Sequence, residues 1–252
     1  MPLDLAALAA ADGKGYEVLE ALSPEGRKSP TFSTSHTFVC VDGKTYWVKA
    51  SAQQGLVAEL ICGRLAARVG CGPIARIIRV TPEAVPPDGS ANHLIGVVVG
   101  SEDERDCVNT RDLTSLAPTF DPKLVDASSR ALVVAFQTWI GIGDTQVMVN
   151  TRTGRIRSID HGECFTATAA ATDPTLTVLE VPGVPRALSN DEASVNSAVE
   201  RLENVTEQQL VDAVARIPLG DPWKSPASRR LEIATWLAAR QPKVRKVMET
   251  WK

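Results

Sequence analysis

Residues 139–165 read WIGIGDTQVMVNTRTGRIRSIDHGECF, and the rest of the chain can be interpreted around this stretch. The acidic loop Gly143-Asp144-Thr145-Gln146 is followed by an apolar run, a turn from Asn150 to Gly154 and a second, alternating run. Two β-prone runs joined through a Gly-containing turn predict a β-hairpin. The tetrad Asp160-His161-Gly162-Glu163 then follows the second strand.

The open end of this hairpin carries polar side chains on both strands. Asp144 and Gln146 enter the first strand, and Asp160 leaves the second. Because a hairpin folds back on itself, we expect these residues to lie side by side. Two carboxylates and an amide offer the oxygen ligands that Mg²⁺ prefers and shares with substrate phosphates. The alternative is an ordinary surface hairpin with solvated acids.

Composition indicates a soluble globular protein. The chain has 252 residues, of which 44% are hydrophobic and 23% are charged, so it can form one large domain or two lobes. A net charge of -3 argues against general nucleic-acid binding, which favours basic proteins.

The distribution of cysteines and apolar runs predicts a cytoplasmic location. The five cysteines are scattered without CxxC spacing, which favours a reducing compartment and no structural zinc. Residues 1–14 lack the basic leader of a secretory signal. The longest apolar run, 131–142, is interrupted by Gln137 and is too short for a membrane span.

The first hundred residues predict a β-rich unit with one helix. Asp42-Gly43 is the strongest short hairpin signal, and after it Trp47 and Lys49 share one face of a strand. A buried helix over 56–70 ends at Gly70. The expected strands are 16–21, 37–41, 44–50, 73–80 and 93–99.

Glu59 lies on the side of this helix that carries small residues. Gly63, Ala66 and Gly70 share that side, and they permit another element to approach closely. We therefore expect the Glu59 carboxylate to meet a cation from a strand.

Gly100-Ser101 and the charged run at 102–106 mark the expected boundary between an N-lobe, 1–100, and a C-lobe, 101–252. The C-lobe is expected to be mostly helical around the hairpin, with a long buried helix (ALVVAFQTWI) within 122–139 and two closing helices over 193–216 and 228–251. The basic side chains near the last helix are interpreted as its solvated face, namely Arg229, Arg230, Arg240, Lys243, Arg245 and Lys246.

The order of these parts resembles the HipA-like kinase family, an atypical group related to the phosphatidylinositol kinases. The matching blocks cover roughly Gly15 to Arg240, and they are FSTSH, DGKTYWVK, LVAELICGRLAARVGCGPI, WIGIGD, SIDHGECF, LENVTEQQLVDAVARIP and WLAAR. The resemblance implies an α+β, two-lobed protein-kinase-like fold with ATP between the lobes.

The resemblance also implies roles for charged residues. Lys49 matches the strand lysine that holds the α- and β-phosphates of ATP, and Glu59 matches its helix partner. Asp160 matches the aspartate that binds Mg²⁺, and Asp144 matches the catalytic base that orients the attacking hydroxyl.

The phosphate-covering loop and the hinge are assigned in the same way. Ser33, Thr34, Ser35 and His36 correspond to the phosphate loop, although this chain lacks the glycines often found there. At the hinge, the backbone of Gly100 and Ser101 would bind the adenine.

The second metal ligand stays open between two residues. The family places an asparagine five residues after the catalytic aspartate, but that position is Val149. Counting back from Asp160 favours Gln146, whereas counting forward from Asp144 favours Asn150. A shortened catalytic loop would reconcile Asp144 with Gln146.

Three functions are compatible with these residues. The first is an ATP- and Mg²⁺-dependent phosphotransferase acting on a protein Ser/Thr or a small-molecule hydroxyl. The second is a pseudokinase that binds a nucleotide or a partner without turnover, and the third is an AMP transferase.

Overall fold

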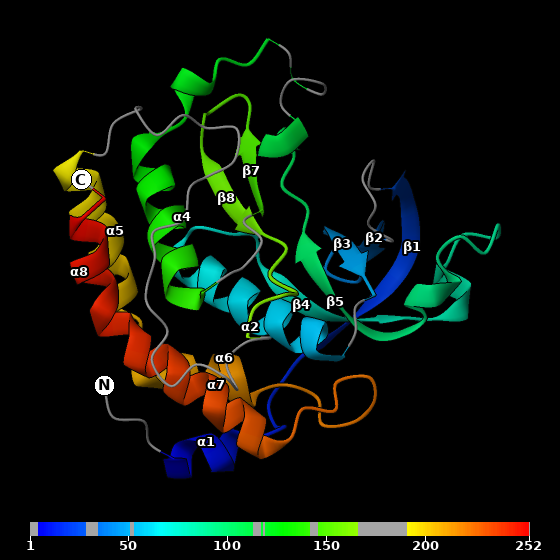
Figure 1. Cartoon of the computed structure of the whole chain (residues 1–252). Coiled ribbons are helices and arrows are strands. Elements are labelled where there is room, and N and C mark those ends of the chain that lie inside the picture. Colours follow the sequence, from blue (N-terminus) through cyan, green and yellow to red (C-terminus); the bar gives the residue numbers. More distant parts are fainter. Residues whose placement is uncertain are drawn as a thin grey trace.

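The computed structural model describes residues 5–28, 35–50, 53–112, 117, 119–141, 146–165 and 191–251. It has an α+β architecture in which a closed five-stranded barrel lies beside a three-stranded sheet and a layer of helices (Figure 1). Figure 1 shows the barrel and most of the helices on opposite sides of helix α2 (Gln53–Val69).

The barrel has the strand order β1-β2-β3-β5-β4. β1 pairs in parallel with β4, and the other neighbours are antiparallel. Its strands are β1 (Val18–Lys28), β2 (His36–Cys40), β3 (Thr45–Lys49), β4 (Ala75–Val80) and β5 (Gly96–Glu102). Because β5 lies between β3 and β4, its backbone is paired on both sides.

The turn between β2 and β3 confirms the hairpin predicted at Asp42-Gly43. Gly43 adopts a φ of +76°, and the Lys44 N–H donates to Asp42 Oδ1 at 3.1 Å. Asp42 does not have a positive φ, so the connection differs from the primed two-residue turns.

Two barrel strands differ from the sequence prediction. β1 continues through Pro24 to Lys28, because two register shifts against β2 accommodate residues that looked like a break. β5 begins at Gly96 rather than at residue 93 and runs to Glu102, since Glu102 still pairs with Tyr46. The change from apolar to charged residues therefore lies within the strand.

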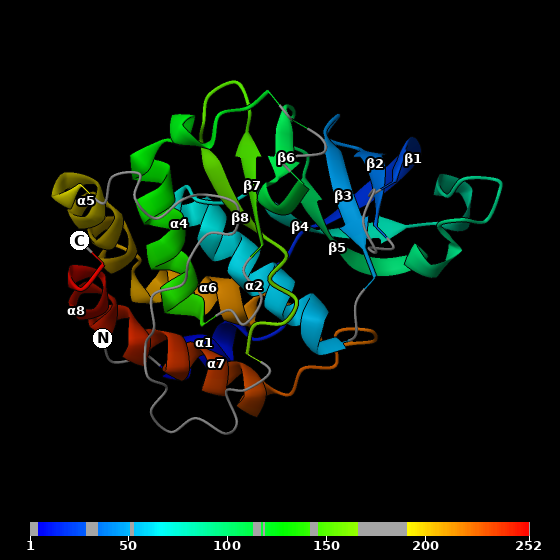
Figure 2. The same cartoon turned by 45° about the horizontal axis from the view of Figure 1, so that its top comes forward.

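Helix α2 belongs to the larger of two hydrophobic cores. The smaller core fills the barrel and includes Phe38, Tyr46 and Val48. The larger core joins α2 residues such as Leu60 to the helical part of the chain. Figure 2 shows α2 between the small sheet and α6 (Glu207–Ala215).

The small sheet has the order β6-β7-β8 and contains the predicted hairpin. Its strands are β6 (Cys107–Asn109), β7 (Gln146–Asn150) and β8 (Ile156–Ile159). Gly154 turns the chain with a φ of +73°, and an added Cβ there would lie 1.9 Å from Leu124 O. The hairpin is confirmed, whereas sequence reasoning missed the three-residue β6.

The helical layer is more broken than predicted. Residues 193–216 form α5 (Glu192–Glu203) and α6, which restarts at a capping box between Thr206 and Gln209. Pro242 interrupts the last predicted helix inside η5 (Gln241–Lys243). The remaining helices are α1 (Leu5–Ala11), α4 (Ala127–Ile140), α7 (Ala227–Arg240) and α8 (Val244–Glu249), with 3₁₀ turns at Pro82–Ala84, Asn92–Leu94, Thr110–Asp112 and Pro122–Leu124.

The first described residues pack on the helical layer. α1 contacts α6 and α7, and the Gly13 N–H donates to Ala215 O at 2.8 Å. No helix in the described part of the chain is long and apolar enough to cross a membrane.

The predicted solvated face of the last helix is wrong for two arginines. Arg230 is 1% exposed and pairs with Asp12 at 2.6 Å. Arg240 is 5% exposed, stacks over Trp236 and donates to the carbonyls of Thr138 and Trp139. Both guanidinium groups join α7 to other segments, which the pattern of one helix could not reveal.

Candidate functional site

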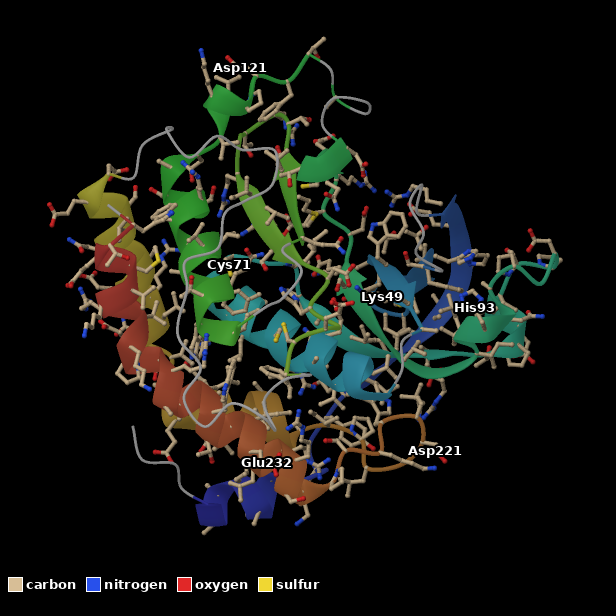
Figure 3. The ribbon with its side chains drawn as sticks, in the orientation of Figure 1. Lys49, Cys71, His93, Asp121, Asp221 and Glu232 are labelled. Carbon is tan, nitrogen blue, oxygen red and sulfur yellow. The ribbon has the colours of Figure 1, made fainter. Side chains whose placement is uncertain are left out.

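A cleft of about 310 Å³ lies between the barrel and the three-stranded sheet. Lys49 at the end of β3, Glu59 in α2 and Asp160 after β8 all line it. Figure 3 labels Lys49 near the middle of the molecule, with the β7–β8 hairpin on one side and the barrel on the other. The cleft therefore gathers residues that are far apart in the sequence.

Lys49 forms ion pairs with both carboxylates. Its Nζ lies 2.7 Å from Asp160 Oδ1 and 3.2 Å from Glu59 Oε2. Burial lowers the pKa of Lys49, but the two negative charges outweigh it and hold that pKa above its ordinary value. The ammonium group therefore remains protonated at neutral pH.

Glu59 is the buried anchor of this arrangement, with a side chain that is 3% exposed. Its Oε2 also accepts a hydrogen bond from the backbone N–H of His161 at 2.7 Å. On the same helix, an added Cβ at Gly63 would lie 2.5 Å from Ala75 Cβ in β4. The close approach expected from the small residues of this helix is confirmed at Gly63.

Asp160 turns its carboxylate into the cleft from a strained backbone. Its φ of +56° lies in the left-handed region, which costs a non-glycine residue about 1 kcal/mol. The side chain is 40% exposed, so it stays accessible to a ligand. Such strain at a polar, accessible residue is typical of functional sites.

A buried polar chain supports the segment that follows Asp160. Gln137 Nε2 donates to Ser158 Oγ at 3.1 Å, and Ser158 Oγ lies 2.9 Å from His161 Nε2. Burial lowers the pKa of His161, so its imidazole is neutral at pH 7. The His161 ring also packs edge-on against Phe136. This position fits a structural rather than a catalytic histidine.

The structure separates the two candidates for the second metal ligand. Gln146 pairs with Ile159, next to Asp160, and it lines the cleft. Asn150 stands at the far end of β7, where its Oδ1 accepts hydrogen bonds from Arg152 and Thr153 in the hairpin turn. Five residues of strand span roughly 13 Å between their ends, so only Gln146 lies near Asp160.

The predicted phosphate loop is described only in part. Ser35 lines the cleft, whereas His36 is buried in β2 against His93. Ser33 and Thr34 lie outside the described residues, as does Asp144.

The hinge assignment of Gly100 and Ser101 needs correction. Both lie inside β5, where Gly100 pairs with Val48 and Arg76 and Ser101 pairs with Trp47 and Ala75. Their backbone groups are thus part of a sheet with neighbours on both sides. Only Ser101 lines the cleft.

Gly100 instead serves packing inside the barrel. An added Cβ there would lie 2.2 Å from Ile78 Cδ1. The backbone first leaves the ladder beyond Asp103, whose N–H still donates to Thr45 O at 2.8 Å.

Sequence reasoning missed a cluster at the cleft edge. Arg27 stacks over the Trp47 ring at 5.5 Å and pairs with Asp103 at 2.8 Å, while Trp47 Nε1 donates to Asp103 Oδ1 at 2.8 Å. Placement of Trp47 on the same strand face as Lys49 was the available signal; nothing local marked Arg27. Asn109 in β6 also lines the cleft, and its Nδ2 lies 3.5 Å from Gln146 Oε1.

The oxygen atoms of Asp160 and Gln146 fit a hard cation that takes its other ligands from phosphate and water. Among the described residues, no three His, Cys, Asp or Glu side chains converge on a metal position. Mg²⁺ usually binds through one or two protein oxygens together with substrate phosphates and water. The accessible Asp160 carboxylate and the neighbouring Gln146 amide would suffice for that mode, with Lys49 available for phosphate oxygens.

A solved kinase structure has a similar fold. The crystal structure of the Helicobacter pylori proinflammatory kinase CtkA aligns at a TM-score of 0.54 and 9% identity, covering 94% of this chain and 97% of that one. The Golgi casein kinase aligns at a TM-score of only 0.38 and 11% identity, over 96% and 75% of the two chains. The likeness to CtkA concerns the fold alone.

Sequence comparisons give the family. No curated protein sequence matches the chain significantly. The family model of the HipA-like kinases matches residues 27–246, which include Lys49, Glu59 and Asp160. The chain therefore belongs to the HipA-like kinase family.

Proposed function

We propose that this protein is an ATP- and Mg²⁺-dependent phosphotransferase that transfers the γ-phosphate to a hydroxyl group. The observation that carries this proposal is Lys49 held between Glu59 and Asp160 in one cleft. In phosphoryl transfer the protein contributes mainly positioning and charge stabilisation. A fixed lysine and an accessible aspartate are the groups that such chemistry needs.

In this proposal the cleft divides a barrel-containing N-lobe from a C-lobe that carries the hairpin. Lys49 binds phosphate oxygens, and Glu59 keeps the ammonium group in position. Asp160 and Gln146 would hold Mg²⁺, which would supply charge neutralisation at the transferred phosphate. Ser35, which lines the cleft just before β2, would contact a phosphate, and the backbone beyond Asp103 would bind the base in place of Gly100 and Ser101.

Asp144 remains the candidate base that orients the acceptor hydroxyl. It lies just before β7, and the described part of that strand places Gln146 two residues later beside the cleft. The acceptor would be a protein Ser/Thr or a small-molecule alcohol.

The test is nucleotide binding and label transfer with the whole chain. Mg-ATP should raise the melting temperature of the wild type, and γ-labelled ATP should transfer its label to the protein, water or an added acceptor. Asp160→Asn should abolish transfer, because it removes the charge that holds Mg²⁺. Asp121→Asn, on the exposed turn before α4, is the matched control and should retain transfer.

The rival functions predict different labels. A pseudokinase would be stabilised by Mg-ATP without any transfer in the wild type. An AMP transferase would incorporate label from α-labelled ATP and none from the γ position. Absence of any stabilisation by Mg-ATP would contradict the nucleotide site itself.

A further inference from the structure

A second hollow of about 440 Å³ lies away from the cleft. It is formed where the segment before β1 passes α2, β4 and α6. All four basic side chains in its lining are arginines, namely Arg64, Arg68, Arg76 and Arg216. The carboxylates in the same lining are Glu17 and Asp212.

These carboxylates do not balance the arginines. Asp212 pairs with Arg216 at 2.8 Å, and Glu17 approaches Arg76 only to 3.9 Å, with an 81% exposed side chain. Arg68 has no ion pair or hydrogen bond with any residue that the structure describes. Four guanidinium groups against two carboxylates leave the hollow at +2, in a chain whose net charge is -3.

Arg64 is partly buried, whereas Arg68 and Arg76 are exposed. Its Nη1 donates to the carbonyls of Ala213 and Arg216 at 3.3 and 2.9 Å, which caps the end of α6. Burial lowers the pKa of Arg64 to about 10, and the positive charges of Arg76 and Arg216 act in the same direction. The positive charges of these arginines therefore repel one another.

Helix capping accounts for Arg64 but not for the whole cluster. Neither Arg68 nor Arg76 reaches the end of α6 through a hydrogen bond, and they come from different elements, α2 and β4. An anion in the hollow would relieve repulsion among all four side chains. Guanidinium groups suit phosphate oxygens because each presents a planar fork of N–H donors.

We propose that this hollow is a binding site for a phosphate-bearing anion, separate from the cleft. The ligand would place its phosphate oxygens among Arg64, Arg68 and Arg76. Its source can be a free phosphorylated metabolite or a phosphorylated side chain, which share this chemistry. The site does not depend on the proposed phosphotransfer, because no residue lining it lines the cleft.

Isothermal titration of the whole chain with pyrophosphate tests this site. The titration is done at constant ionic strength with EDTA, so that no metal assists binding in the cleft. The double variant Arg68→Gln/Arg76→Gln should weaken binding by roughly tenfold or more, because charge-assisted hydrogen bonds are lost. Both side chains are exposed, so the fold should survive.

Two single variants distinguish binding in this hollow from binding in the cleft or to surface charge in general. Arg79 lies on the same strand as Arg76 but outside the hollow. The Arg79→Gln variant should therefore bind pyrophosphate like the wild type. Lys49→Met removes the ammonium group that lies between Glu59 and Asp160 in the cleft and should also leave pyrophosphate binding to the hollow unchanged. If Lys49→Met lost pyrophosphate binding while the double variant retained it, the anion would lie in the cleft and the proposal would be overturned.

Two further results would overturn the proposal, and a comparison of two ligands would identify the source of the phosphate group. Absence of saturable pyrophosphate binding, or equal weakening by Arg79→Gln, would also overturn it. Tighter binding of a phosphoserine peptide than of pyrophosphate, lost in the double variant, would identify a phosphorylated side chain as the source. Tighter binding of pyrophosphate than of the peptide would identify a free phosphorylated compound as the source.

Discussion

The Glu59 carboxylate accepts the backbone N–H of His161 at 2.7 Å, so α2 is joined directly to the segment that follows Asp160. The same oxygen lies 3.2 Å from the Lys49 ammonium group. One buried carboxylate thus positions both the lysine and the chain next to the aspartate.

Glu59→Ala should lower the free energy of unfolding by about 2 to 4 kcal/mol, because it leaves a buried N–H without an acceptor and Lys49 with one anionic partner fewer. Glu59→Gln should cost less, since its amide oxygen can still accept the His161 N–H. Urea denaturation measures both. Glu232→Ala, at an exposed pair on α7, is the control; an equal loss there would contradict this role.

Stability should fall in mild acid through His161. Its pKa is lowered in the folded protein by burial from the ordinary value of 6.5. The unfolded chain therefore takes up a proton as the pH drops below 6.5, while the native imidazole stays neutral. The free energy of unfolding should be insensitive to this group above that pH and decrease by up to about 1.4 kcal/mol per unit below it.

His161→Phe tests this titration, because the variant has no group to protonate. Its absolute stability should fall, since Ser158 loses its partner. The readout is instead the difference in pH slope between 7 and 5 from urea midpoints. Parallel slopes for wild type and variant would show that His161 does not cause the acid sensitivity.

Substitution of Gln146 should change the Mg²⁺ requirement, whereas substitution of Asn150 should change stability. Gln146→Ala should raise the Mg²⁺ concentration needed for label transfer and leave unfolding almost unchanged, because its side chain faces the cleft. Asn150→Ala should cost about 1 to 2 kcal/mol of stability, since its Oδ1 accepts turn hydrogen bonds. A Mg²⁺ titration of transfer activity separates them, and an altered Mg²⁺ requirement in Asn150→Ala alone would reverse the assignment.

Gly154 should tolerate alanine less well than Gly43 does. Both have left-handed backbones, so each substitution costs about 1 kcal/mol from conformation alone. An added Cβ at Gly43 meets nothing within 4 Å, whereas at Gly154 it meets Leu124 O at 1.9 Å. Thermal unfolding should therefore show a clearly larger loss for Gly154→Ala, and equal losses would exclude a steric contribution.

Substitution of the buried Arg240 of α7 should lower stability more than substitution of the exposed Arg245 of α8. Arg240→Ala should cost about 3 kcal/mol, because it leaves the Thr138 and Trp139 carbonyls unpaired and exposes Trp236. Arg245→Ala removes an exposed pair with Glu203 and should change stability by less than about 1 kcal/mol. Similar unfolding midpoints for both variants would contradict the burial of Arg240.

Local patterns were sufficient for the parts of the site that lie at the ends of regular elements. The Asn150–Gly154 turn, the face of β3 that carries Lys49 and the small residues near Glu59 all depend on short-range geometry. They predicted that Lys49, Glu59 and Asp160 belong together once the family resemblance had supplied their roles.

Tertiary context decided what the sequence could not predict. Pro24 looked like a break, yet register shifts keep it in β1, and the short β6 becomes a strand only by pairing with β7. Arg27 reaches the cleft through Trp47 and Asp103, which lie far along the chain. Gly100 resembled a hinge, although the space it leaves is filled by Ile78.

The docking of α1 on α6 and α7 has a consequence for synthesis on the ribosome. Helix α1 can dock only after α6 and α7 have been synthesised, about two hundred residues later. Contacts between distant segments slow folding, because the chain loses loop entropy before they form. We expect the part of the larger core that α6 and α7 cover to form only after those helices are made, so a chain truncated before them would expose α2 to chaperones and proteases.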